Sequence, residues 1–76
     1  MSDEDVREQV RKLIVTGDNR LKQGHDARVL VKARETFERA LALAEHHGIA
    51  DERLREIVGR RIDDSHARER AAQGGS

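Results

Sequence analysis

The stretch TFERALALAEHHG, residues 36–48, decides the fold of this 76-residue chain. When it is wound at about 100° per residue, its apolar side chains gather on one side and most of its charged side chains on the other. Gly48 follows a pair of histidines, and glycine is the residue most often found just beyond the end of a helix. The stretch therefore predicts the second half of an amphipathic helix that ends at residue 47.

This helix is expected to begin at about residue 26 and to be the central element of the fold. Asp26 is a good N-cap residue, so the helix covers about residues 26–47. Its apolar stripe extends over about 160°. The stripe is formed by Leu30, Ala33, Phe37, Leu41 and Ala44, with Val29, Ala40 and Leu43 along one side. A stripe this wide can contact two neighbouring helices, with Phe37 at the centre of the core.

A first helix is predicted over about residues 3–23. Ser2 suits its N-cap, because acidic residues fill the turn that follows. The segment TGDN, residues 16–19, has the composition of a turn. We favour a continuous helix because the residues on both sides of Gly17 keep the apolar stripe in phase. Gly24 then suits the left-handed position that ends many helices.

A third helix is expected over about residues 51–65. Ile49 can pack back on the helix that precedes it and also on the start of this third helix. Gly59 would allow another backbone to approach closely. The apolar face of the helix consists of Leu54, Ile57, Val58 and Ile62. These residues predict an amphipathic helix that packs on the rest of the fold through this one face.

Beyond Ile62, the positions that should continue this apolar face hold polar residues. We therefore expect order to fade there. The single helical domain then covers residues 1–65, and residues 66–76 form a frayed helix end and a flexible tail.

The composition limits the possible classes of function. The 15 basic and 15 acidic residues cancel, so the chain has no excess charge to attract nucleic acid or an anionic membrane. It has no cysteine, and no apolar run approaches the roughly 18 residues that span a bilayer. The acidic start lacks the features of a signal peptide. We expect a lean folded domain in the cytoplasm, without membrane contact.

Enzymatic and metal-binding functions find little support. His46 falls on the polar face of its helix and His47 at the edge of the apolar stripe, so the two cannot serve one inward-facing site. His25 and His66 have no partner at a recognisable spacing. The chain has no phosphate-binding loop, nucleophile elbow or dinucleotide fingerprint. We expect no enzyme, no cofactor and no small-molecule ligand; metal binding or acid–base chemistry at the paired histidines is a minor alternative.

A second alternative is a small regulatory protein that binds nucleic acid. Its basis is the group of arginines in the third helix: Arg53, Arg55, Arg60, Arg61, Arg68 and Arg70. These arginines are spread around the helix among acidic residues, and no aromatic side chain is present there to stack on bases. The sequence pattern therefore does not favour nucleic acid as a partner.

The segment ARETFERALALAE, residues 33–45, resembles the second helix of a tetratricopeptide repeat. Ala33, Phe37 and Ala40 match the small, aromatic, small pattern of that helix. The resemblance covers about one sixth of the chain and implies a helical hairpin used for contacts between proteins. The tryptophan of the family's first helix and the proline after its second helix are absent. One hairpin cannot stack into a solenoid, so a repeat array is not expected.

The sequence thus predicts an all-α, antiparallel three-helix arrangement, consisting of a tetratricopeptide-like hairpin and a third helix. The stripe of the central helix is wider than one neighbour covers, so we expect self-association into a homodimer. The interface candidates are Val29, Leu43, Ile57 and Ile62. In the alternative, the third helix covers all of this surface and the chain is a stable monomer. The expected function is a non-enzymatic protein–protein interaction or adaptor module.

Overall fold

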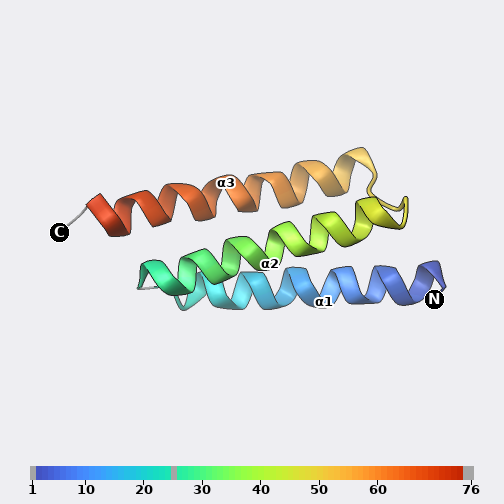
Figure 1. Ribbon diagram of the computed structural model, residues 1–76, viewed down its shortest axis with the longest axis horizontal. Coiled ribbons are helices and arrows are strands. Elements are labelled where there is room, and N and C mark those ends of the chain that lie inside the picture. The colour runs from blue at the N-terminus through green and yellow to red at the C-terminus, as the bar shows by residue number, and fades with distance from the viewer. Residues whose placement is uncertain (1, 25, 75–76) are drawn as a thin grey trace.

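The computed structural model describes residues 2–24 and 26–74, which form three helices: α1 (Asp3–Lys22), α2 (Ala27–His46) and α3 (Glu52–Gly74). Consecutive helices run in opposite directions, and α2 lies between α1 and α3 (Figure 1). Both outer helices pack on α2 and have little backbone contact with each other. The predicted all-α antiparallel arrangement, with the second helix in the middle, is confirmed.

Short polar side chains begin each helix. The Ser2 Oγ atom accepts a hydrogen bond from the Asp5 amide at 3.3 Å, and the Asp26 carboxylate accepts one from the Arg28 amide at 2.9 Å. Such bonds satisfy amides that have no partner within the helix. The predicted caps at Ser2 and Asp26 are confirmed, and the segment 16–19 is part of continuous α1 rather than a turn.

The corner between α2 and α3 is built by Gly48 and Ile49. Gly48 has a φ of +69°, a conformation that glycine adopts without steric cost. The Gly48 amide bonds the Glu45 carbonyl oxygen at 3.1 Å, and the Ile49 amide bonds the Ala44 carbonyl oxygen at 2.9 Å. This pair of bonds is a Schellman motif. The chain then enters α3 through Asp51, whose carboxylate accepts a hydrogen bond from an amide of the first turn.

The apolar core has two clusters along α2. The first cluster joins α1 to the C-terminal half of α2 through Val6, Val10, Ala40 and Ala44, with Ile49 and Leu54 packed against it. Ile49 therefore packs back on the helix that it follows, as predicted. The small alanines let the two helices approach closely, because they place no long side chain between the backbones.

The second cluster, here called the Phe37 cluster, lies where all three helices meet. It consists of Ala33, Phe37 and Val58, with side chains of α1 and α3 packed against it. Phe37 is fully buried, as predicted for the centre of the core. Its ring lies directly against the backbone of Gly17, because a Cβ atom at position 17 would be only 2.6 Å from the Phe37 Cε1 atom. The ring fits only because residue 17 has no side chain.

The end of α3 differs from the prediction. The helix continues to Gly74 instead of ending near residue 65. Beyond Ile62 its inner side is polar, yet Ser65 is fully buried and Glu69 is 8% exposed. The Ser65 hydroxyl donates to the Arg61 carbonyl oxygen at 2.8 Å, so its burial leaves no unmade hydrogen bond. Residues 75–76 of the predicted tail lie outside the described residues.

A partly buried ion pair holds this part of α3 against α2. The Arg34 Nε atom donates to the Glu69 Oε2 atom at 2.8 Å, and Arg34 also bonds Glu38 on its own helix. The hydrogen bond to Glu69 raises the pKa of Arg34 above its ordinary value, although burial acts in the opposite direction. Polar contacts therefore replace the missing apolar stripe and join this part of α3 to α2.

Two glycines differ from their predicted roles. Gly24 does not adopt the left-handed conformation expected at the end of α1; instead, its missing side chain makes room for Leu30, whose Cδ2 atom would lie 2.5 Å from a Cβ at position 24. No atom lies within 4 Å of a Cβ built at Gly59. None of the described residues therefore makes the close backbone approach that Gly59 would allow.

Replacing each of two helical glycines by alanine is expected to change stability in opposite directions. Gly17→Ala should lower the free energy of unfolding by about 1–3 kcal/mol, because the clash with the buried Phe37 ring outweighs the gain in helix propensity. Gly59→Ala, the matched control, should raise it by about 0.5–1 kcal/mol, because it adds propensity without a clash. Chemical denaturation of both variants tests this, and equal stabilisation by both would contradict the described packing.

Removing the buried carboxylate is expected to release the end of α3. Glu69→Ala should cost about 1–3 kcal/mol, because it leaves the Arg34 guanidinium partly buried without its partner. Amide hydrogen exchange should become faster mainly in residues 63–74. Glu56→Ala is the control, since its ion pair with Arg60 is exposed and should contribute less than about 1 kcal/mol. Unchanged exchange in the Glu69→Ala variant would show that other contacts hold this segment.

Candidate protein interaction surface

The most distinctive surface lies between α1 and α3. Two shallow hollows lie between these two helices, and their lining comes from α1, α3 and the corner between α2 and α3. We call the residues that line them the α1–α3 seam. The seam consists of Arg7, Val10, Arg11, Ile14, Val15, Asp18 and Leu21 of α1, Ile49 and Asp51 of the corner, and Leu54, Ile57, Arg60, Arg61 and Asp64 of α3.

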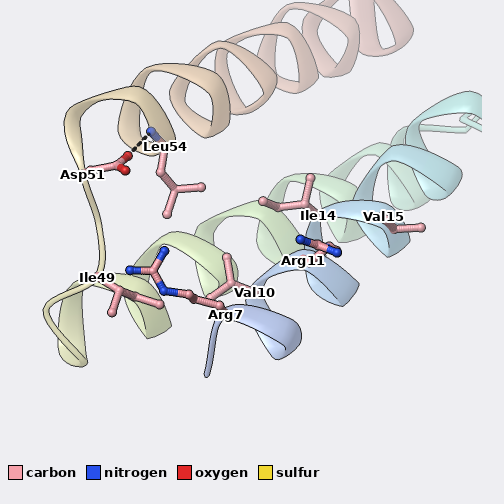
Figure 2. A pocket seen from close by; sticks show the side chains of 8 residues that line it. All are labelled: Arg7, Val10, Arg11, Ile14, Val15, Ile49, Asp51 and Leu54. Carbon is pink, nitrogen blue, oxygen red and sulfur yellow. Dashed lines mark hydrogen bonds between the residues drawn. The ribbon is translucent and has the colours of Figure 1, made fainter. Parts of the chain in front are cut away.

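The first hollow, of about 320 Å³, lies near the N-terminal ends of α1 and α3. Figure 2 shows Leu54 of α3 pointing across the opening towards α1, with Ile49 closing one end. Val10, Ile14 and Val15 contribute apolar surface from α1. The Asp51 carboxylate at the edge accepts the Leu54 amide hydrogen bond at 2.7 Å and so fixes the start of α3. This half of the seam is an apolar surface with charged edges.

The second hollow, of about 450 Å³, lies further along the same two helices. Its sides are Asp18 and Leu21 of α1 and Ile57 and Asp64 of α3. The Arg61 Nε atom donates to the Asp18 Oδ1 atom at 2.8 Å and joins the two helices. The seam therefore runs from Arg7 at one end to Asp64 at the other.

Two apolar side chains of the seam are exposed to solvent. Val15 is 52% exposed and Ile57 is 37% exposed, and these are the large apolar side chains that the described residues leave exposed. They lie on different helices, yet both line the seam. Exposed apolar side chains gathered in a groove are typical of a surface that contacts another protein.

The charges of the seam are distributed unequally along its length. Arg7 and Arg11 lie at the first hollow and form no ion pair with any described residue. At the second hollow, Asp18 pairs with Arg61 and Asp64 with Arg68. The arginines of the first hollow thus pair with no described residue, whereas the second hollow holds two carboxylates that are already paired and the arginines Arg60 and Arg61.

The four predicted interface residues do not form one surface. Leu43 is half-buried against the first cluster, and Ile62 is half-buried against the Phe37 cluster. Val29 is half-buried and lines neither hollow of the seam. Ile57 is exposed and belongs to the seam. The seam also contains a second exposed apolar side chain, Val15, which was not among the predicted interface residues.

The sequence contains one indication that Val15 belongs to the candidate interface. It is an apolar residue on the charged side of α1, away from the stripe that packs on α2. A single apolar residue in such a position is common on protein surfaces. Its significance depends on the position of α3, which brings Ile57 to the same seam.

The histidines do not assemble a site. His46 and His47 are both exposed, and their rings meet edge to face with centroids 5.1 Å apart. The His66 Nδ1 atom lies 3.7 Å from the Glu69 carboxylate, and His25 lies outside the described residues. Among the described residues, no group of three or more histidine or acidic side chains is arranged to hold a metal ion.

Most arginines of α3 form ion pairs with carboxylates. Arg55, Arg60, Arg61 and Arg68 form ion pairs with Glu45, Glu56, Asp18 and Asp64, respectively. An arginine that already pairs with a carboxylate contributes less to an attractive field for phosphates. This arrangement gives the nucleic-acid alternative no additional support.

Comparisons of the chain with protein-family models, with curated protein sequences and with solved structures returned no match. Within residues 2–24 and 26–74, no helix is both long enough and apolar enough to cross a membrane. The proposed function therefore rests on the α1–α3 seam.

Proposed function

We propose that this chain is a non-enzymatic protein–protein interaction module that associates with a second helical chain, in the first instance another copy of itself, through the α1–α3 seam. The single observation that carries the proposal is the position of Val15 and Ile57, two exposed large apolar side chains that line two hollows between the same pair of helices, α1 and α3. Covering them would remove apolar surface from water.

The form of the groove supports a helical partner. Two helices that lie side by side on a third leave a groove into which further helices can pack, as in helix bundles. Its apolar middle and charged edges match the usual arrangement of a protein interface, in which polar groups surround an apolar centre. The resemblance of residues 33–45 to a tetratricopeptide helix agrees with this class of function but does not identify the partner.

The proposal is for a binding protein rather than an enzyme. The hollows are open grooves, whereas small-molecule sites enclose most of their ligand. The exposed His46 and His47 lie beside each other, and the Glu69 carboxylate near His66 already pairs with Arg34, so neither place offers the free acid–base pair that general catalysis requires. The proposal also assigns the module to the cytoplasm, where reducing conditions suit a chain without cysteine.

Placing a charge in the apolar middle of the seam is expected to prevent self-association. The native chain should have the mass of a dimer at tens of micromolar, measured by light scattering after size exclusion. Ile57→Glu should weaken the dimer at least about tenfold, because burial of an isoleucine contributes about 1.5–3 kcal/mol. Because Ile57 lies on the surface, the substitution should leave the helical content unchanged.

Two control variants separate the seam from other surfaces. Ala42→Glu introduces the same charge at an exposed position of α2 outside the seam, and Val29→Glu does so at another of the predicted interface residues. Both should remain dimeric. A monomer mass for the native chain at tens of micromolar would remove the proposed self-association, and a dimer unaffected by Ile57→Glu would remove the seam as its site.

A further inference from the structure

We propose that the first hollow of the α1–α3 seam is a docking site for an acidic amphipathic helix of another protein. Such a helix places an apolar side chain in the hollow and carboxylates against Arg7 and Arg11. This inference rests on the proposed function of the seam and adds the chemistry of a partner other than a second copy. The position of two unpaired arginines beside an apolar hollow carries it.

The apolar lining of the first hollow can receive a side chain of a partner. Val10, Ile14 and Val15 line it from α1, and Ile49 and Leu54 line it from the other side. A partner side chain buried there removes apolar surface of both chains from water. The hollow therefore supplies the apolar centre of an interface, and its charged edge decides which partner fits.

The α1 edge of this hollow carries two arginines that form no ion pair. Arg7 and Arg11 are exposed and lie one helical turn apart. Asp3 precedes Arg7 by four residues and Glu8 precedes Arg11 by three, spacings that allow ion pairs on a helix, yet neither pair forms. No other carboxylate of the described residues pairs with them either. Two positive groups are therefore available to a partner.

Asp51 also lines the hollow but does not pair with these arginines. Figure 2 shows it beside Leu54 at the start of α3, whereas Arg7 and Arg11 project from α1. Its carboxylate accepts the Leu54 amide hydrogen bond at 2.7 Å. At this place the positive end of the α3 dipole compensates part of its charge. The α1 edge therefore remains positive, and carboxylates of a partner fit there.

The spacing of the two arginines suits a helical partner. Residues four apart on a helix are displaced by about 6 Å along its axis, so two glutamates one turn apart match the separation of Arg7 and Arg11. An amphipathic helix carries such an edge beside its apolar stripe. When this helix lies along the seam, its stripe faces the hollow and its glutamates face α1, where they can form charge-assisted hydrogen bonds.

A second copy of this chain covers the seam without satisfying these arginines. The carboxylates of its second hollow, Asp18 and Asp64, already pair with arginines of their own chain. Its exposed Ile57 is preceded one turn earlier on α3 by the exposed Arg53, so contact through Ile57 brings further positive charge. An acidic helix covers the apolar surface and also supplies the missing negative charge. The first hollow therefore favours an acidic helix over a second copy.

Binding of synthetic helical peptides tests the chemistry of the partner. Three peptides share leucines along one face and differ at two positions one turn apart beside that face, which hold glutamate, glutamine or lysine. At low ionic strength the glutamate peptide should bind the native chain at least about tenfold more tightly than the glutamine peptide, and the lysine peptide should bind most weakly. Added salt should reduce this preference. Fluorescence anisotropy of the labelled peptides measures the dissociation constants.

Variants of the two arginines test whether they read the charge of the peptide. Arg7→Glu combined with Arg11→Glu should reverse the preference, so that the lysine peptide binds most tightly. Arg7→Gln combined with Arg11→Gln should bind the glutamate and glutamine peptides equally. Arg28→Glu combined with Arg39→Glu is the control, because it changes the net charge by the same amount at exposed positions of α2 outside the seam. This control should keep the preference for glutamate.

A further variant tests the hollow itself. Val15→Glu places a charge in the apolar lining and should weaken binding of the glutamate peptide at least about tenfold. Ala42→Glu introduces the same charge on an exposed part of α2 and should leave the binding unchanged. Circular dichroism of each variant checks that the helices are intact.

Each other outcome overturns a defined part of the inference. Equal binding of the glutamate and glutamine peptides, or an unchanged preference after reversal of both arginines, overturns the acidic partner. Binding that Val15→Glu does not weaken overturns the first hollow as the site, and the absence of saturable binding by the glutamate peptide overturns the whole inference. The mass of the native chain without peptide tests self-association separately. A monomer that prefers the glutamate peptide would remove the second copy and keep this inference, and a dimer that binds no peptide would do the reverse.

Discussion

The contact between the Phe37 ring and the backbone of Gly17 is the constraint on which the rest of the structure depends. The chain has one aromatic residue, and its ring is fully buried where α1, α2 and α3 meet. No side chain at position 17 separates the ring from α1, so the ring lies against the helix itself. A 76-residue chain buries a modest share of its surface, and each close contact therefore contributes a large part of its stability.

The same contact determines the surface from which function is inferred. Because Phe37 and the alanines of α2 hold α1 on one side and α3 on the other, the outer helices are joined to each other mainly by side chains such as the Asp18–Arg61 pair. The seam between them exposes Val15 and Ile57. The small core does not bury these two side chains, so apolar surface remains that a second chain can cover. The packing of the monomer is in this way connected to the proposed association.

Local sequence signals were sufficient to predict most of the fold. The cap at Asp26, the left-handed Gly48 and the wide stripe around Phe37 are properties of short segments, and the structure has each of them. The end of α3 was not predictable in this way. Glu69 is held by Arg34, which lies 35 residues away in the sequence, so the apolar pattern of α3 alone placed the end of the helix too early.

The interface was less accessible to sequence analysis than the fold. Ile57 was selected for its place on the apolar face of α3, whereas Val15 became notable only when the structure brought it to the same seam. Leu43 and Ile62 were selected by the same periodicity, but they pack mainly within the core clusters. Periodicity indicates which side of a helix is apolar, and only the packed structure shows how much of that side remains uncovered.

A double-mutant cycle between Gly17→Ala and Phe37→Leu tests the central contact most directly. If the ring against the glycine backbone is the constraint described above, Gly17→Ala should be costly in the native background and nearly neutral after Phe37→Leu, because the smaller side chain leaves room for a Cβ atom. The coupling free energy from chemical denaturation should exceed about 1 kcal/mol. Effects that add to within about 0.5 kcal/mol would show that the two residues act independently and would contradict the account.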